Sequence, residues 1–318
     1  MKIKVVGIII CTLLIAFATP SVGIMIKNYN IKNIGNSEGV VRQIPIDPND
    51  PNADCYVSCS ETLFYIVYED FYDISHPIST VHWWGIFLYY NWDDGKFYNC
   101  DHEGIIFDIV FYENDMGKPG NELCYFANVS PTILETGVKY KFPGIAPVWD
   151  LYYFKYDLNP TFTISEGWIS IRNSNSPNNC SFAWMVSPDG NGRALINHHG
   201  GPWFDCPDFA LMLSDQEEAN LEIGIKGGFG STIEITNTGQ GTLNNIDVDI
   251  MVFGGIFRLI NIHIKEIISE LEPGKKTSLK TGIFLGFGEI AIGVIADDVV
   301  NYHDGTQLFM LTIMGGNR

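Results

Sequence analysis

Ten consecutive residues, Val81-His-Trp-Trp-Gly-Ile-Phe-Leu-Tyr-Tyr90, decide the fold class. All but two of them are aliphatic or aromatic. Aromatic and β-branched side chains favour strands, and the turn sequence Asp93-Asp94-Gly95 follows shortly after. The stretch therefore predicts a β-strand that ends in a tight turn.

The same pattern extends outward over residues 52–218. Residues 105–113 and 152–158 alternate apolar and polar side chains, as half-buried strands do. Gly, Asn, Asp and Pro mark the turns between them, as in Ser165-Glu166-Gly167 and Pro188-Asp189-Gly190. Helical periodicity never persists beyond roughly ten residues. This domain is predicted to be an antiparallel β-sandwich of jelly-roll type.

The composition changes near residue 219. All seven tryptophans and fourteen of the fifteen tyrosines precede it. Beyond it, residues 231–237 and 246–250 alternate strictly and Glu272-Pro-Gly274 forms a turn. Residues 219–318 are therefore predicted to form an immunoglobulin-like β-sandwich. Residues 19–51, rich in Asn, Gly, Pro and Asp, are predicted to be an extended or disordered lead-in.

The first residues predict export. Two lysines precede an apolar run over residues 5–17, and Ala16-Phe17-Ala18 supplies small residues for cleavage. These are the parts of a signal peptide over residues 1–18. An uncleaved anchor is the alternative, since apolar residues continue to Ile26, but Pro20 and Ser21 weigh against it. The prediction is a secreted or cell-surface protein with no membrane span after cleavage.

The cysteine count agrees with an oxidising compartment. Seven cysteines less Cys11 leave six in the mature chain: Cys55, Cys59, Cys100, Cys124, Cys180 and Cys206. An even number predicts up to three disulfides, and local staples are favoured: Cys55 with Cys59, Cys100 with Cys124, and Cys180 with Cys206. A zinc site is the alternative, although Cys55 and Cys59 lack a second closely spaced pair. The sequons at Asn128 and Asn179 predict glycosylation in exposed loops, with chance matches as the alternative.

The charge excludes two classes of partner. The chain carries 19 basic and 37 acidic residues, for a net charge of −18. Nucleic-acid binding depends on Lys and Arg that displace counterions, and anionic lipid surfaces attract the same residues. We therefore expect no nucleic-acid partner and no attraction to such lipids.

Three groups of residues are candidates for chemistry. Asp93, Asp94, Asp101 and Asp115 offer hard oxygen ligands on loops, which suits a structural calcium ion, with solvated turn acids as the alternative. No other cofactor is predicted. Trp92, Trp149 and Trp203 lie in turn-rich segments and are predicted to form an exposed stacking platform, with core packing as the alternative. The third group, for metal binding or acid–base chemistry, is His198 and His199 with His82, His102, Asp205 and Asp208, with an exposed Gly-rich loop as the alternative. The adjacent His198 and His199 would point to opposite sides of a strand, which disfavours a shared metal.

Catalysis has little support in the sequence. Neither Gly-x-Ser-x-Gly nor His-Glu-x-x-His occurs. The chain is therefore predicted not to be an enzyme. Paired carboxylates brought together by folding, as in a polysaccharide hydrolase or lyase, remain the alternative.

The order of motifs adds a resemblance. Glu69-Asp70-Phe71, the run at 81–85, the strand at 107–112 with its glycine turn at 115–120, Gly167-Trp168-Ile-Ser-Ile171 and Phe182-Ala-Trp184 follow one another. This order resembles β-sandwich modules of secreted bacterial and archaeal surface proteins, similar to carbohydrate-binding and discoidin-like jelly rolls, over roughly residues 69–213. Residues 221–318 resemble CARDB-type adhesion modules through Ile235-Thr-Asn-Thr-Gly239 and Leu271-Glu-Pro-Gly274.

Together these features predict an exported, non-catalytic protein. The resemblance implies that it binds an extracellular polysaccharide or another cell-surface polymer. A structural or adhesion protein that binds other surface proteins is the alternative.

Overall fold

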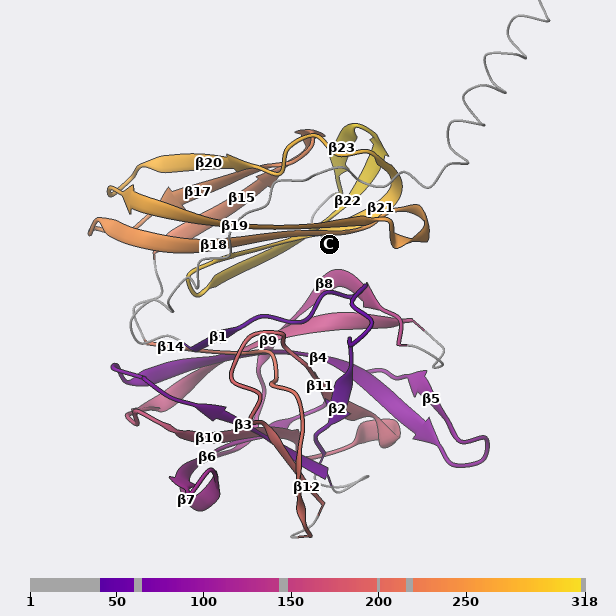
Figure 1. Cartoon of the computed structure of the whole chain (residues 1–318), viewed down its shortest axis with the longest axis vertical. Helices are drawn as coiled ribbons and strands as arrows, with labels where there is room; N and C mark the ends of the chain where they lie inside the picture. Colours follow the sequence, from indigo (N-terminus) through magenta and orange to yellow (C-terminus); the bar gives the residue numbers. More distant parts are fainter. Residues whose placement is uncertain (1–40, 60–64, 143–147, 199–200, 216–219, 316–318) are drawn as a thin grey trace, which may run out of the picture. The chain divides into compact units, whose positions relative to one another are not determined.

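The computed structural model describes residues 41–59, 65–142, 148–198, 201–215 and 220–315. These residues form 23 strands and two short 3-10 helices, η1 (Pro177–Asn179) and η2 (Ile256–Arg258) (Figure 1). The predicted all-β class is confirmed. Within the described ranges, no helix is long and apolar enough to span a membrane. The predicted signal peptide, residues 1–18, lies outside them, as do residues 19–40 and most of the segment between the two sandwiches.

The first sandwich consists of two antiparallel sheets, and their strands run as follows. The eight-stranded sheet contains β1 (Val41–Gln43), β2 (Cys55–Val57), β4 (Ile78–Asn91), β5 (Lys96–Asn99), β8 (Thr132–Tyr140), β9 (Trp149–Phe162), β11 (Ser181–Met185) and β14 (Leu211–Ser214). The six-stranded sheet has the order β13 (Trp203–Asp205), β12 (Leu195–His198), β3 (Tyr65–Phe71), β10 (Gly167–Asn173), β6 (Phe107–Asp115) and β7 (Lys118–Val129). The chain changes sheet between β3 and β4, between β7 and β8 and between β9 and β10, which fits the predicted sandwich.

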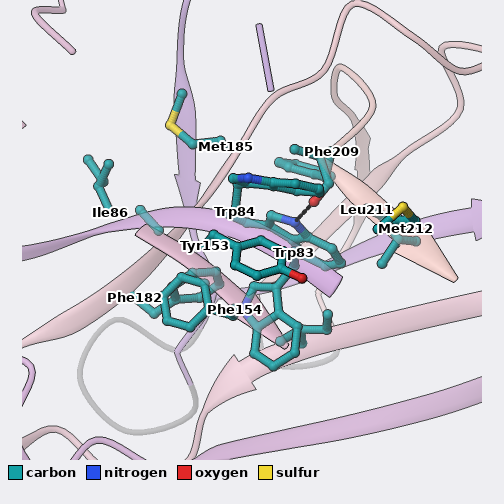
Figure 2. Packing of buried hydrophobic residues seen from close by; sticks show 14 of the residues in the cluster. Trp83, Trp84, Ile86, Tyr153, Phe154, Phe182, Met185, Phe209, Leu211 and Met212 are labelled. Carbon is teal, nitrogen blue, oxygen red and sulfur yellow. Dashed lines mark hydrogen bonds between the residues drawn. The ribbon is translucent and has the colours of Figure 1, made fainter. Parts of the chain in front are cut away.

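Strand β4 contains the predicted strand over residues 81–90, and it is buried from Ile78 to Leu88. Trp83 stacks on Phe154 at 5.2 Å (Figure 2). It also contacts Phe107 of the six-stranded sheet at 5.6 Å. The next residue, Trp84, points the other way, and its Nε1 donates to Tyr302 Oη of the second sandwich at 3.0 Å. Both faces of β4 are therefore covered, which is why its sequence is apolar almost throughout rather than alternating.

Gly85 lies where β4 and β11 approach most closely. A Cβ atom at this position would lie 2.2 Å from the Phe182 ring and 2.5 Å from Ala183 O. Only a residue without a side chain fits here, so the single glycine in the apolar run is a packing requirement.

The second sandwich has an aliphatic core. Its three-stranded sheet has the order β15 (Leu221–Lys226), β17 (Thr232–Asn237) and β20 (Lys276–Lys280). Its six-stranded sheet has the order β16 (Gly228–Phe229), β23 (Leu311–Met314), β22 (Val299–Phe309), β21 (Gly286–Ala296), β18 (Leu243–Gly254) and β19 (Ile260–Leu271). Apart from the short strands β16 and β23, the first, second and fifth strands along the chain (β15, β17 and β20) form one sheet. The others (β18, β19, β21 and β22) belong to the second sheet. Immunoglobulin-like sandwiches divide their strands in a closely similar way.

The extended or disordered lead-in predicted over residues 19–51 reaches too far along the chain. Strand β1 pairs with β14 through Val41 opposite Leu213, and Ile44 and Ile46 are buried in the core. Residues 41–51 therefore belong to the first sandwich. The segment is polar overall, so its composition does not reveal the short alternation of apolar residues through which β1 pairs with β14.

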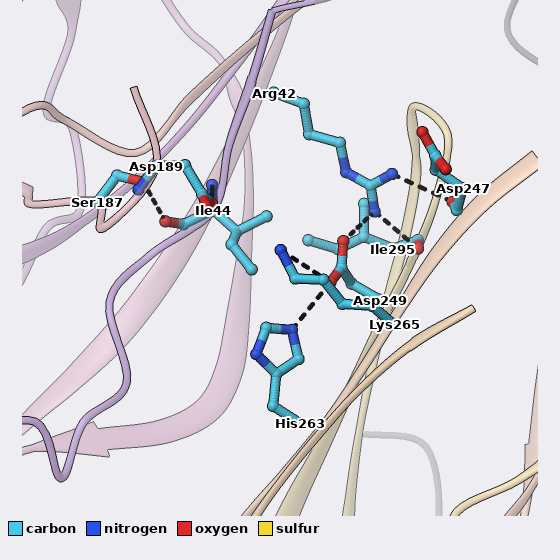
Figure 3. A network of polar contacts seen from close by, with 9 residues as sticks. All are labelled: Arg42, Ile44, Ser187, Asp189, Asp247, Asp249, His263, Lys265 and Ile295. Atoms are coloured by element: carbon cyan, nitrogen blue, oxygen red, sulfur yellow. Dashed lines mark hydrogen bonds and ion pairs between the residues drawn. The ribbon is translucent and has the colours of Figure 1, made fainter. Parts of the chain in front are cut away.

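Arg42 of β1 is held by the second sandwich. Its Nη2 lies 2.8 Å from Asp249 Oδ2 and donates to Ile295 O at 3.0 Å, while Nη1 donates to Asp247 O at 3.1 Å (Figure 3). His263 Nε2 lies 2.8 Å from the other Asp249 oxygen. The guanidinium is largely buried, so it forms a directional contact between the two sandwiches.

The structure forms one disulfide among the described residues, between Cys100 and Cys180, with a Cα–Cα distance of 5.6 Å. Strand β4 brings them together because Leu88 pairs with Asn99 on one edge and with Ser181 on the other. Cys55, Cys124 and Cys206 are thiols. The predicted pairings Cys55–Cys59, Cys100–Cys124 and Cys180–Cys206 are therefore wrong. They followed proximity in sequence, whereas the register on β4 sets proximity in space.

We expect Arg42→Ala to lower the free energy of unfolding by about 3 kcal/mol, because it leaves Asp249 buried with weaker compensation. Chemical denaturation of the full chain measures this change. Lys139→Ala is the matched control, since its ion pair with Asp150 is exposed and contributes little. Equal effects of the two substitutions would contradict a stabilising role for Arg42.

We expect Cys100→Ser to lower the free energy of unfolding by about 4 kcal/mol, because the disulfide closes a loop between residues 80 positions apart. Cys124→Ser removes a half-buried thiol and should change stability far less. Thermal denaturation under non-reducing conditions compares the two variants. A loss in Cys124→Ser as large as that in Cys100→Ser would point to a different pairing.

Candidate ligand-binding site

The outer face of the six-stranded sheet in the first sandwich carries a second, separate set of aromatic residues. On β3, Val67 and Phe71 point into the main core, whereas Tyr68 points to the opposite side. The same alternation on β10 places Ile169 inside and Trp168 outside. The outer residues are Tyr68, Tyr112, Tyr125, Trp168 and Trp203, which we call the aromatic face.

Tyr68 makes edge-to-face contacts with two of the other rings. The ring of Tyr68 lies 5.1 Å from Trp203 and 5.4 Å from Tyr112. Trp168 is almost fully buried beside them, Tyr112 and Trp203 are half-buried, and Tyr125 is 47% exposed at the margin. The predicted platform residue Trp203 therefore lies in an aromatic cluster with accessible edges.

Polar groups are interleaved with the rings. Tyr125 Oη donates to Asp108 Oδ2 at 2.7 Å, and Arg172 Nε lies 3.7 Å from the same oxygen. Tyr112 Oη lies 3.3 Å from Ser170 Oγ. Burial raises the pKa of Tyr112, and the hydrogen bond to Asp108 raises that of Tyr125. Both phenols therefore stay protonated at neutral pH and serve as neutral hydrogen-bonding groups.

A cavity of about 280 Å³ opens at one end of this face. It is lined by Asp70, Phe71, Tyr72, Asn114, Glu166, Gly167, Asn191 and Arg193. Trp168 Nε1 lies 3.5 Å from Asn114 Oδ1, which joins the aromatic face to the cavity. At Gly167 a Cβ atom would lie 2.5 Å from Tyr112 O, so the close pairing of β10 with β6 beside the cavity requires glycine.

Three carboxylates meet beside the cavity. One oxygen each from Glu69, Asp70 and Asp208 lies within 4.8 Å of the others, and we call this group the carboxylate cluster. Burial, and then the charge of Asp208, raise the pKa of Glu69 well above its ordinary value. Burial also raises the pKa of Asp70. Among the described acidic, histidine and cysteine side chains, this is the group whose ligand atoms lie close enough together to hold a metal ion.

The predicted calcium ligands are not brought together. Asp93 and Asp94 lie in the turn between β4 and β5, Asp101 follows β5, and Asp115 ends β6. Asp94 and Asp101 accept hydrogen bonds from the nearby amides of Lys96 and Glu103. The carboxylate cluster contains none of the four.

The other predicted platform residues separate from Trp203. Trp149 is 1% exposed and packs against Phe142, so its predicted exposure is wrong. It lies at the start of β9 and faces the core, although turn residues surround it in sequence. Trp92 is 74% exposed at the end of the β4–β5 hairpin, where it contacts Tyr90 edge-on.

The remaining predicted residues add no ring to the aromatic face, although the Asn128 amide donates to Asp108 Oδ1 at 3.0 Å. The sequon residues Asn128 and Asn179 are both exposed. His82 is buried between Tyr153 Oη and Ser214 Oγ, and burial lowers its pKa to about 3. It therefore acts as a neutral core residue. His199 lies outside the described residues.

Sequence reasoning missed most of this site. Tyr68, Tyr112 and Tyr125 alternate with core residues along their strands, and that period of two was the available signal. Glu69 and Asp208 lie 139 positions apart, and no local motif links them.

A scan of the sequence against protein-family models finds no match, and neither does a search of the curated proteins.

Proposed function

We propose that this protein is an exported, non-catalytic glycan-binding protein, and that the aromatic face with its adjoining cavity is the binding site. The observation that carries the proposal is the row of aromatic rings and neutral hydroxyl groups on the outer face of a sheet whose inner face is apolar. The resemblance of the motif order to carbohydrate-binding jelly rolls supports the same function.

The chemistry of the face suits a sugar. Sugar rings have apolar C–H faces that pack on aromatic rings, and Tyr and Trp also supply a polar tip at a wet surface. The phenols of Tyr112 and Tyr125 are neutral and both donate and accept hydrogen bonds. Asn114, Asn191 and Arg193 at the cavity offer further polar groups for hydroxyl recognition.

The dimensions favour a chain that ends in the cavity. Sites for drug-sized ligands range over roughly 300–1,000 Å³, and the cavity here is about 280 Å³. We therefore expect it to hold a single terminal sugar, while the following units lie along the aromatic face toward Trp203.

A second candidate function is adhesion to another protein through the second sandwich. Phe257 within η2 and Leu259 directly after it are 88% and 81% exposed, and Phe229 of β16 is 73% exposed. Large exposed apolar side chains are typical of interaction surfaces. This candidate places the partner on the second sandwich and leaves the aromatic face without a role.

The test is binding of the full mature chain to a panel of soluble and insoluble polysaccharides. We expect Trp203→Ala and Tyr125→Ala each to weaken binding by about tenfold, equivalent to roughly 1.4 kcal/mol. Trp92→Ala is the matched control, because Trp92 is an exposed tryptophan on the other sheet. It should bind as the wild type does.

Three outcomes would contradict the proposal. Loss of binding in Trp92→Ala alone would place the ligand at the β4–β5 hairpin. Equal binding by all variants would remove the aromatic face from recognition. Absence of binding to every polysaccharide, together with binding to a surface protein that Phe257→Ser abolishes, would favour the adhesion function.

A further inference from the structure

We propose that the carboxylate cluster is a calcium-binding site, with Glu69, Asp70 and Asp208 as carboxylate ligands and Gln43 Oε1 as an amide ligand. This inference goes beyond glycan binding, and it concerns a different set of atoms from the predicted calcium ligands.

The carboxylates are held in place by N–H groups. Glu69 Oε1 accepts from Gln43 Nε2 at 2.9 Å, and Glu69 Oε2 accepts from the Phe209 amide at 2.7 Å. Asp208 accepts from the amides of Gly192 and Arg193 at 2.6 and 3.0 Å. These bonds orient the oxygens before any ligand arrives.

Both oxygens of Glu69 and both oxygens of Asp208 already accept N–H donors. The described residues form no ion pair between the cluster and Lys, Arg or His within 4.0 Å. Arg193 is a positive charge that acts on Asp70 from a greater distance. A buried group of like charges normally requires closer compensation, which a bound cation would supply.

Gln43 supplies an independent observation. It is only 7% exposed, and its Oε1 has no hydrogen-bond partner among the described residues. Its amide borders the cluster, because Nε2 donates to Glu69 and lies with Asp208 Oδ2 at the space beside Gly190. A buried amide oxygen without a partner is unfavourable unless a ligand satisfies it.

Gly190 keeps this space open. A Cβ atom at this position would lie 2.4 Å from Asp208 Oδ2 and 2.6 Å from Gln43 Nε2. Its φ of 109° is also one that other residues rarely adopt. Any larger residue would therefore press into the cluster from the loop side.

The donor atoms select the class of metal. All four ligands are oxygens, which suit hard cations, whereas zinc prefers nitrogen and sulfur. Calcium accepts six to eight oxygens in irregular geometry, but magnesium demands a near-ideal octahedron. Ligands from β1, β3 and the segment before β14 form an irregular set, so calcium fits better.

Bound calcium would join segments that are distant in the chain. It would tie β1 to β3 and to the segment between β13 and β14. The same amides of Gly192 and Arg193 that hold Asp208 belong to the loop that places Asn191 and Arg193 at the cavity. Calcium would therefore also brace one wall of the cavity.

The test uses the full mature chain, stripped with a chelator and dialysed, and titrated with calcium chloride alone by calorimetry at pH 7.5. We expect one ion per chain with a dissociation constant of roughly 0.1–1 mM, as in other extracellular modules. The melting temperature should rise with calcium concentration. Magnesium chloride should bind more weakly.

Three variants locate the site. Glu69→Gln and Gly190→Ala should weaken calcium binding by about tenfold or more. Because these positions are confined, Asp70→Asn is the variant that keeps the test valid if the other two do not fold. This substitution leaves a side-chain oxygen that can accept from Asn191 Nδ2, and position 70 is half-buried. Asp101→Asn, at an exposed predicted calcium residue, is the matched control and should bind calcium as the wild type does.

Specific results would overturn the proposal. One is the absence of both binding heat and a shift in melting temperature up to about 5 mM calcium. Another is calcium binding that is unchanged in Asp70→Asn. A third is a loss of calcium binding in Asp101→Asn equal to that in Asp70→Asn. Tighter binding of magnesium than of calcium would overturn the choice of metal. None of these results depends on a glycan, so this test and that of glycan binding can fail separately.

Discussion

The burial of β4 on both faces is the constraint on which the rest of the structure depends. Trp83 packs into the first sandwich, while Trp84 reaches Tyr302 of the second. A strand covered on one side would alternate apolar and polar residues, whereas this one is apolar almost throughout. Its edges also position β5 and β11, and with them the Cys100–Cys180 disulfide. One strand thus organises the eight-stranded sheet, positions the disulfide and contacts the second sandwich.

The eight-stranded sheet packs on both sides, whereas the outer face of the six-stranded sheet carries a separate set of aromatic residues outside the main core. Tyr68, Tyr112 and Trp203 pack there with polar neighbours such as Ser170. Beside them, Glu69 and Asp208 are buried as acids held by N–H donors, and Gln43 joins them with an unpartnered oxygen. Burying several acids together is unfavourable unless another group compensates for their charge. This tension distinguishes the site from ordinary core packing.

Local features that depend on the nearest residues were predictable. The strand at 81–90, the turn Asp93-Asp94-Gly95 and the all-β class all follow from composition and periodicity. The candidate site was less predictable. Trp203 was among the predicted residues and lies in the aromatic face. Trp149 was also predicted to be exposed, but it begins β9 and its side chain is buried in the core. Asp93, Asp94 and Asp101 gather in sequence, yet Asp94 and Asp101 accept hydrogen bonds from amides two residues further along the chain. Gln43, Glu69 and Asp208 lie on separate segments, so no spacing rule could join them.

The sequence by itself determined the fold class, because the alternation and turn chemistry that specify strands act between neighbouring residues. The net charge of −18, on which the prediction of no nucleic-acid partner rests, is also a property of the sequence alone, because it is a sum that folding does not change. Only the tertiary structure decided which cysteines pair, which tryptophans are buried and which acids meet. Those outcomes depend on strand register and on sheet faces. Shifting a strand by one residue moves each of its side chains to the opposite face, so only the folded arrangement decides these contacts.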